Sequence, residues 1–98
     1  MKEVGDTGVA IAERFFFAIE ELANRKVIRG LGTFARRYNL NYGNLYMLKC
    51  NIKTRNVRTE YLAYLAQDYG VSSEWLLLGN GEMFVEGAAA LYPKPAKR

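Results

Sequence analysis

The sequence predicts an all-α fold of five short helices without a β-strand. In the first quarter of the chain, apolar residues recur at steps of three and four, the spacing of a helix that buries one face. Further along, Asn, Thr, Ser and Gly residues of the kind that start or stop helices separate short apolar stretches. Half of the 98 residues are apolar, which is sufficient for one modest helical core. We therefore expect one compact domain over residues 8–84.

The first predicted helix runs from about Gly8 to Asn24, and Asp6 or Thr7 is available to cap it. Its apolar stripe consists of Ile11, Phe15, Ala18, Ile19 and Leu22, widened by Ala12, Phe16 and Ala23. Phe17 falls on the opposite face, among acidic residues. There it is either a lone exposed aromatic residue, which is common, or a contact with a partner.

Two short helices are predicted next, over residues 31–38 and 42–50, after a basic connector. The bend between them contains Asn39, and Asn tolerates the left-handed backbone that a sharp bend needs. Helices that cross steeply need a small residue where they approach, and Ala35 stands at that position. The apolar positions that such a pair buries are filled by Phe34, Tyr38, Leu40, Leu45 and Leu48. This register predicts a helix-turn-helix motif over residues 31–50.

Two further helices complete the predicted domain. Thr59 is expected to cap a helix that runs to Tyr69, and the glycine after it supplies the stop. Ser72 or Ser73 is expected to cap a last short helix through Leu78, with an acidic residue in its first turn.

The C-terminal region is predicted in two parts. Met83 and Phe84 follow a Gly-Asn-Gly turn, so they can fold back onto the body of the domain. From Val85 onward the chain is rich in Ala, Pro and Lys, which is typical of a flexible segment. Residues 85–98 are therefore expected to form a flexible basic tail.

Positive charge is concentrated in the middle of the chain. The net charge is only +4, but residues 24–59 hold nine basic side chains and no acidic one. An ordinary solvated surface mixes both signs. This window is therefore either an accident of a basic protein or the footprint of a polyanion, of which the phosphate backbone is the obvious one.

Composition argues against several classes of function. With one cysteine, Cys50, and no histidine, the chain lacks ligands for a nitrogen–sulfur metal site and a base for a histidine-assisted nucleophile. Glu13, Glu20 and Glu21 share one helix, but nothing indicates a pocket around them, so we expect no enzyme, cofactor or small-molecule ligand. No signal peptide is evident, and an apolar run such as residues 15–19 is far too short to span a membrane. We expect a soluble, cytoplasmic protein.

A resemblance to a known family adds to this interpretation. The stretch FARRYNLNYGNLYMLK, with YLAYLAQDYGVSSEWLLLGNGEMF downstream, resembles the lambda-repressor-like, or Cro/repressor-type, helix-turn-helix family over residues 11–84. The resemblance implies a five-helix domain that binds DNA through the second helix of the motif, often as a homodimer. The chain departs from the family in its longer first connector, in Leu31 where a phosphate-gripping polar residue is common, in Gly32, and in a second helix with almost no charge toward DNA.

The resemblance places five residues in the major groove, namely Asn41, Tyr42, Gly43, Tyr46 and Met47. The asparagine can pair with adenine, and the glycine lets the backbone approach the duplex. The two tyrosines suit a thymine methyl group or a phosphate; otherwise they form a half-buried pair that stabilises a short helix. Because no arginine lies on this face, we expect an A·T-leaning site.

The basic residues fit a positioning role better than base reading. The candidates for phosphate contact are Arg36 and Arg37 on the first helix of the motif, then Lys49, Lys53, Arg55 and Arg58. Any one of them alone is equally well a solvated surface charge. Six such contacts would give a slope of about −5 for log affinity against log salt concentration. The basic residues of the tail, Lys94, Lys97 and Arg98, either add diffuse attraction or are plain solvated charges.

A single domain of this size covers one half-site, so we expect a homodimer on double-stranded DNA. The candidate dimer contacts are Phe17, Trp75, Met83 and Phe84, although a tryptophan on a closing helix also fits a core position. The expected function is sequence-specific, nucleoid-associated DNA binding by a small prokaryotic or phage-type transcriptional regulator, such as a repressor of a phage or mobile element. The alternatives are a protein-interaction module that keeps the fold without base reading, and RNA binding through the tyrosines.

Overall fold

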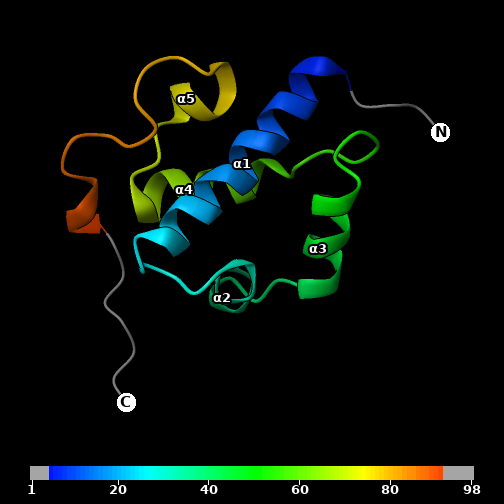
Figure 1. Ribbon diagram of the computed structural model, residues 1–98, viewed down its shortest axis with the longest axis horizontal. Coiled ribbons are helices and arrows are strands. Elements are labelled where there is room, and N and C mark those ends of the chain that lie inside the picture. Colours follow the sequence, from blue (N-terminus) through cyan, green and yellow to red (C-terminus); the bar gives the residue numbers. More distant parts are fainter. Residues whose placement is uncertain (1–4, 92–98) are drawn as a thin grey trace. The chain divides into compact units, whose positions relative to one another are not determined.

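The computed structural model describes residues 5–91, and nearly all of their regular structure is helical (Figure 1). The elements are α1 (Asp6–Asn24), α2 (Leu31–Arg37), α3 (Tyr42–Cys50), α4 (Thr59–Tyr69), α5 (Ser73–Leu78) and a short 3-10 helix, η1 (Ala88–Leu91). No strand occurs between residues 5 and 91, where an isolated β-bridge joins Val71 to Phe84. The predicted all-α class with five α-helices is confirmed for this part of the chain.

The chain divides into two units, which are described separately. Helices α1, α2 and α3 belong to the first unit, which ends at Val57, and the remaining helices belong to the second, which begins at Arg58. The expected domain of residues 8–84 thus spans both units, whereas the predicted motif of residues 31–50 lies wholly within the first.

The apolar face of α1 forms the core of the first unit. Its buried residues are Ala12, Phe15, Phe16, Ala18, Ile19 and Leu22. The Phe15 ring meets the Phe34 ring of α2 edge-on, with 5.6 Å between the ring centroids, so an aromatic contact joins the two helices. The predicted stripe is confirmed, with Ile11 and Ala23 half-buried at its margins.

Helix α1 begins two residues earlier than predicted. Its N-cap is Gly5, which makes no side-chain capping bond, and Asp6 lies inside the first turn. The prediction that the helix starts near Gly8 with Asp6 or Thr7 as its cap is therefore wrong. A carboxylate in the first turn still stabilises the helix, because it faces the positive end of the helix dipole.

Lys26 closes the end of α1 in a conformation that the sequence did not predict. Its φ is 64°, in the left-handed region. Its backbone N–H donates to the Ala23 carbonyl at 3.0 Å, and the Val27 N–H donates to the Leu22 carbonyl at 2.9 Å. These two bonds form a Schellman motif, which usually has glycine in the left-handed position.

Asn39 closes the end of α2 in the same way, and here the sequence prediction is confirmed. Its φ is 57°, its N–H donates to the Arg36 carbonyl at 3.3 Å, and the Leu40 N–H donates to the Ala35 carbonyl at 2.8 Å. Asn is the non-glycine residue that best tolerates this backbone. The left-handed residue ends α2 and turns the chain toward α3.

The second unit is closed by a backbone clamp. Its α4 begins at Thr59 with Arg58 as the N-cap residue, so Thr59 lies one position inside the helix rather than at the predicted cap. The predicted serine cap of α5 is Ser72, whose hydroxyl accepts a bond from the Trp75 N–H at 3.2 Å. The Ser72 N–H also donates to the Met83 carbonyl at 2.8 Å, so the segment around Met83 folds back as predicted.

The structure differs from the tail expected over residues 85–98. Residues 88–91 form η1, and Ala88 is buried, so an ordered segment stands where a flexible tail was predicted. An alanine-rich segment can pack closely against a helix because its side chains are short. The same composition is also typical of a flexible linker, which is why the sequence predicted a tail. The remainder of the expected tail, including Lys94, Lys97 and Arg98, lies outside the described residues.

Candidate nucleic-acid interface

The packing of α2 against α3 fixes the framework of the site. In Figure 1, α2 is seen almost end-on while α3 lies in the plane of view, so the two helices cross steeply. Ala35 is buried, and its small side chain lets the helices approach. Phe34, Leu45 and Leu48 are also buried, and Tyr38 and Leu40 are half-buried, as the motif register predicted.

The outward face of α3 is defined by the burial of Leu45 and Leu48. At 3.6 residues per turn, the positions on the opposite side are 42, 43, 46, 47 and 50. All five residues are exposed. Four of them are predicted groove residues, and the fifth is Cys50. We call Tyr42, Gly43, Tyr46, Met47 and Cys50 the outer face of α3.

Two tyrosines dominate the outer face. Tyr42 is 50% exposed and Tyr46 is 48% exposed, so about half of each side chain is accessible, and the alternative of a half-buried pair that stabilises the helix stays open. Their rings stack with 6.1 Å between centroids and 23° between planes. A Cβ atom added at Gly32 would lie 3.9 Å from the Tyr42 ring, so a larger residue at the start of α2 would contact this ring.

Asn41 is the N-cap of α3. Its side-chain oxygen accepts a hydrogen bond from the Asn44 backbone N–H at 2.8 Å. Pairing with adenine needs both the oxygen and the amide nitrogen of an asparagine in one plane with the base edge. The structure therefore gives the side chain of Asn41 a helix-capping bond that competes with the reading role expected for it.

Gly43 lies next to that cap. A Cβ atom at position 43 would lie 3.2 Å from the side-chain oxygen of Asn41, which is closer than ordinary van der Waals contact. A residue without a side chain therefore accommodates the cap. It also leaves the backbone of the first turn of α3 open on the outer face.

Tyr46 is linked to Cys50, one turn further along α3. A hydrogen bond with the Cys50 side chain, followed by electrostatic interaction with Cys50 and with Tyr42, raises the pKa of Tyr46 above its ordinary value of 10.0. The phenol of Tyr46 therefore keeps its proton to a higher pH than an ordinary tyrosine does. Sequence reasoning missed Cys50, although its spacing of four from Tyr46 and eight from Tyr42 could have found it.

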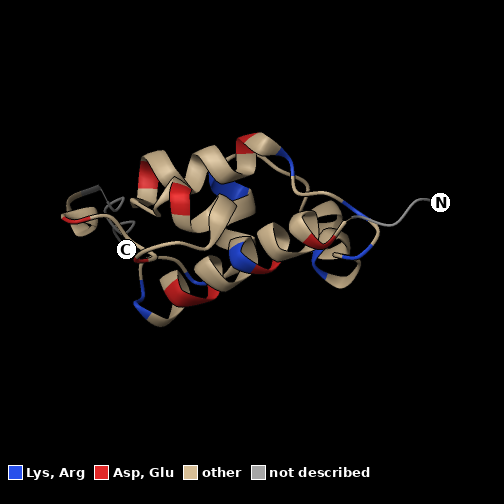
Figure 2. Cartoon of the chain, turned by 90° about the horizontal axis from the view of Figure 1, so that it is seen from above, with Lys and Arg blue, Asp and Glu red and all other residues tan. Residues whose placement is uncertain are grey.

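Figure 2 colours the Lys and Arg positions of the chain blue. Three of the six predicted phosphate contacts carry exposed, uncommitted charge, namely Arg36, Lys53 and Arg55. None of them forms a salt bridge within residues 5–91. Lys53 and Arg55 lie on the loop after α3, and two backbone N–H groups of that loop, those of Thr54 and Arg55, donate to the Asn51 carbonyl at 3.0 Å. The loop therefore holds two cations just beyond the C-terminal end of α3.

Two other predicted contacts have partners inside the protein. The Arg37 guanidinium donates to the Tyr38 hydroxyl at 3.2 Å. Arg58 belongs to the second unit, where its guanidinium lies 3.7 Å from the Glu60 carboxylate. Both side chains are exposed, and a neighbouring carboxylate offsets the attraction of Arg58 for a phosphate.

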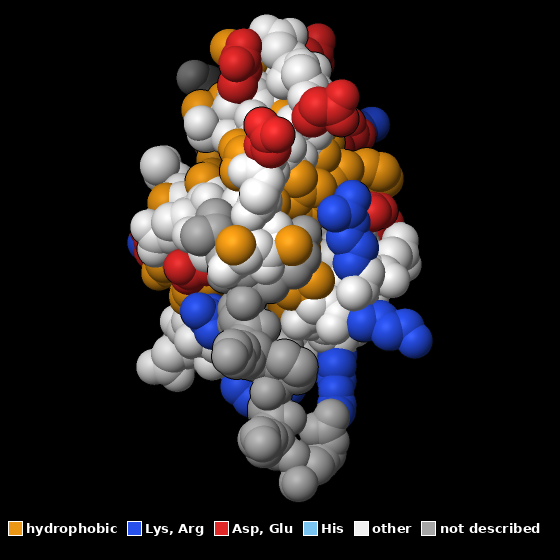
Figure 3. Space-filling model, turned by 90° about the vertical axis from the view of Figure 1, so that its left-hand side faces the viewer, with side chains coloured by type: hydrophobic (Ala, Val, Ile, Leu, Met, Phe, Trp, Pro, Cys, Tyr) orange, Lys and Arg blue, Asp and Glu red, His pale blue; other side chains and the backbone are white. Residues whose placement is uncertain are grey.

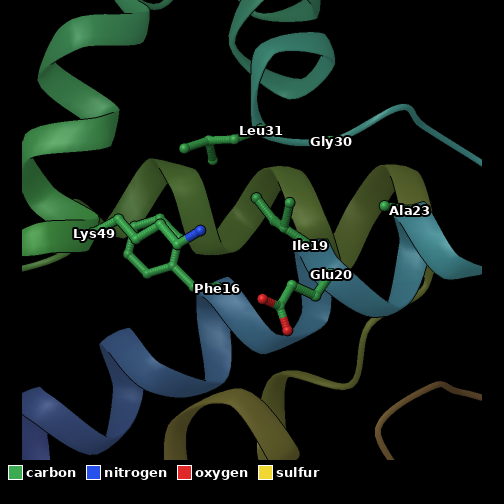
Figure 4. A pocket seen from close by; sticks show the side chains of 7 residues that line it. All are labelled: Phe16, Ile19, Glu20, Ala23, Gly30, Leu31 and Lys49. Carbon is green, nitrogen blue, oxygen red and sulfur yellow. The ribbon is translucent and has the colours of Figure 1, made fainter.

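Lys49 lies at the flank of α3 that faces α1. It lines a pocket of about 160 Å³ with residues of α1 and of the start of α2, and Figure 4 shows its side chain extending from α3 toward α1. The remaining lining residues are Phe16, Ile19, Glu20, Ala23, Gly30 and Leu31. Glu20 supplies a carboxylate to the same pocket, so the charge of Lys49 is directed away from the outer face. No sequence signal joins positions 20 and 49, which tertiary packing brings together.

The predicted dimer contacts differ in their exposure. Phe17 is 53% exposed, as its place on α1 predicted, whereas Trp75, Met83 and Phe84 are half-buried within the second unit. Sequence reasoning missed other exposed apolar side chains of that unit, which are Leu77, Leu78 and Val85. Hydrophobic side chains are visible at the surface of the face drawn in Figure 3.

Two features, a cluster of metal-ligating side chains and a membrane-spanning helix, are absent from the described part of the chain. Between residues 5 and 91, no three His, Cys, Asp or Glu side chains come together as a metal site would require. No helix in that range has the length and apolar character needed to cross a bilayer.

Comparison of the chain with protein-family models, with curated proteins and with solved structures finds no match in any of the three. The site is therefore interpreted from its own geometry.

Proposed function

We propose that the protein binds double-stranded DNA in a sequence-specific manner, with the outer face of α3 in the major groove. The observation that carries the proposal is the steep packing of α2 and α3 around Ala35 and the left-handed Asn39, which leaves one whole face of α3 exposed. A major groove about 12 Å wide admits one α-helix. A helix supported from behind by another helix is the arrangement that helix-turn-helix proteins use to enter it.

The distribution of charge supports the same proposal. Arg36 lies on α2, while Lys53 and Arg55 lie beyond the C-terminal end of α3, so exposed cations stand on both sides of the outer face along the chain. Cations in such positions hold phosphates and thereby set the register of a helix in the groove. The outer face itself carries no charged residue, so affinity rests on the flanks.

We propose that the protein is a transcriptional regulator similar to the Cro-type repressors. Such a regulator acts as a homodimer on a palindromic site. The lambda-repressor-like fold and the pairing of two copies are part of the proposal. The exposed Phe17 of α1 is the candidate contact between copies, because an apolar side chain gains free energy when it is removed from water.

A second candidate function is binding to another protein. It is favoured by the uncharged outer face, where Tyr42, Tyr46 and Met47 expose about half of their surface each. Aromatic residues and methionine are enriched in protein interfaces.

The experiment that separates the two is selection of bound sequences from a random duplex pool at about 0.15 M salt, where non-specific binding is weakened. The proposal predicts enrichment of one motif, as two half-sites separated by about one helical turn if the protein binds as a dimer. Duplexes recovered without a common motif would contradict sequence-specific binding and favour the protein-interaction module. A parallel pool of single-stranded RNA covers the stacking alternative, in which the tyrosines bind unpaired bases.

A further inference from the structure

The outer face of α3 has a chemical character that narrows what it can recognise. Its accessible side chains are two phenol rings, a thioether and a thiol, on Tyr42, Tyr46, Met47 and Cys50. The first three lie within one and a half turns of one helix, and the two rings stack on each other. Because the two rings already pack on each other, they lose less conformational freedom on binding than two separate side chains would.

Side chains that carry both a donor and an acceptor group, as an amide does, or a charge, are already bonded or lie off the outer face. The side-chain oxygen of Asn41 is held by the Asn44 N–H. Gly43 has no side chain, and the one charged residue of α3, Lys49, lines the pocket on the α1 side. Asn44 itself is exposed, but it lies on the flank between the outer face and the buried side. Bidentate recognition of guanine or adenine therefore lacks a donor–acceptor pair on the outer face.

The apolar group that bases present in the major groove is the C5-methyl group of a pyrimidine. We propose that the outer face of α3 recognises C5-methyl groups of pyrimidines, through Tyr42, Tyr46 and Met47. This inference rests on the proposed function and names the chemical group that is read. Because the contact is to the methyl group and not to the polar edge, 5-methylcytosine substitutes for thymine. Binding is then sensitive to cytosine methylation wherever a cytosine occupies a contacted position.

The size of the effect follows from the area of one methyl group. Removing a group of that size from water changes affinity about fourfold, the equivalent of about 0.8 kcal/mol for one buried CH₂. Two contacted methyl groups in one half-site would together change affinity by about one order of magnitude if their effects add.

The test uses four versions of the duplex that the selection enriches, measured with the intact protein. At each thymine of the motif, the base pair is made T·A, U·A, 5-methyl-C·G or C·G, which varies the methyl group and the polar edge independently. We expect U·A to bind about fourfold more weakly than T·A, C·G to bind about fourfold more weakly than 5-methyl-C·G, and T·A and 5-methyl-C·G to agree within about twofold. Equal binding of T·A and U·A at every thymine would overturn the inference, and so would 5-methyl-C·G binding as weakly as C·G.

Protein variants assign the effect to the outer face. Tyr46→Phe keeps the ring and is expected to keep the ratio between T·A and U·A, whereas Tyr46→Ser should bring that ratio at its contacted position close to one. A ratio unchanged by Tyr46→Ser and by Met47→Ser would overturn the assignment to these residues. The DNA comparison needs no variant, so the inference can be tested even if a substituted chain fails to fold. If a motif is enriched but its affinity does not depend on the methyl group, only this inference is overturned. If no motif is enriched, the proposed function is overturned as well.

Discussion

The side-chain oxygen of Asn41 accepts a 2.8 Å hydrogen bond from the backbone N–H of Asn44, and this bond starts α3. Asn41, which was expected to pair with adenine, therefore caps the helix with the same side chain. The two roles can be separated because serine caps a helix as well as asparagine does but lacks the amide that pairs with adenine.

We predict that Asn41→Ala lowers the free energy of unfolding by about 1 kcal/mol, while Asn41→Ser leaves it nearly unchanged. Urea unfolding followed by circular dichroism measures both. On the selected duplex, Asn41→Ser should bind like the parent chain. A loss of affinity by Asn41→Ser at full stability would restore the base-reading role of the amide.

A second prediction concerns the left-handed residue at the end of α1. Because the φ of Lys26 is 64°, and a side chain in this conformation costs about 1–2 kcal/mol, Lys26→Gly should raise the free energy of unfolding. The greater freedom of glycine in the unfolded chain reduces the gain to about 0.5–1 kcal/mol. The matched control is Lys53→Gly, at an exposed position whose φ is not positive. A destabilised Lys26→Gly variant would contradict the Schellman motif there.

A third prediction is that basic residues without a salt bridge contribute to the salt dependence of DNA binding, whereas a basic residue in a salt bridge does not. Replacing Arg36 or Arg55 with Gln should flatten the slope of log affinity against log salt by about 0.9, the value of one phosphate contact. Arg25 is the matched control, because its guanidinium already pairs with the Glu21 carboxylate at 2.9 Å. Fluorescence anisotropy over a series of salt concentrations measures the slopes. The same flattening for Arg25→Gln would mean that general charge, and not the named flanks, supplies the affinity.

A fourth prediction concerns the titration of Tyr46. The hydrogen bond with Cys50 raises the pKa of Tyr46, so Cys50→Ala should move it back toward 10.0, as measured by the absorbance change of the phenolate. A raised pKa in the folded state means that the folded chain holds this proton more tightly than the unfolded chain does. Its contribution to stability is present below pH 10 and is lost as the pH rises through the raised value. A Tyr46 pKa that Cys50→Ala leaves unchanged would exclude Cys50 as the cause.

The framework of the site could be predicted from the sequence because it depends on local requirements. Phe34, Leu45 and Leu48 follow helical spacing, Ala35 is the small residue at a crossing, and Asn39 is the residue type that a left-handed turn accepts. Each of these is a property of one residue and its near neighbours.

The partners of the charged residues could not be predicted in the same way. Lys49 and Glu20 line the same pocket between α1 and α3, and nothing in either segment predicts that they come near each other. Arg58 pairs with Glu60 through a choice of side-chain rotamers. Lys26 adopts a left-handed backbone that its residue type disfavours, because the hydrogen bonds of the motif around it outweigh the local preference.

The central claim, that the outer face of α3 lies on the duplex, can be tested through Cys50. This cysteine is exposed at the end of that face and is the one cysteine of the chain. An iron chelate tethered to it generates hydroxyl radicals that cut DNA close to the attachment point. The control carries Cys50→Ser together with Ser73→Cys, which moves the tether to an exposed position on α5 in the second unit. The account predicts strong cuts confined to a few nucleotides within each selected half-site for the Cys50 tether. Even cutting along the whole duplex from Cys50, or the same pattern from position 73, would contradict it.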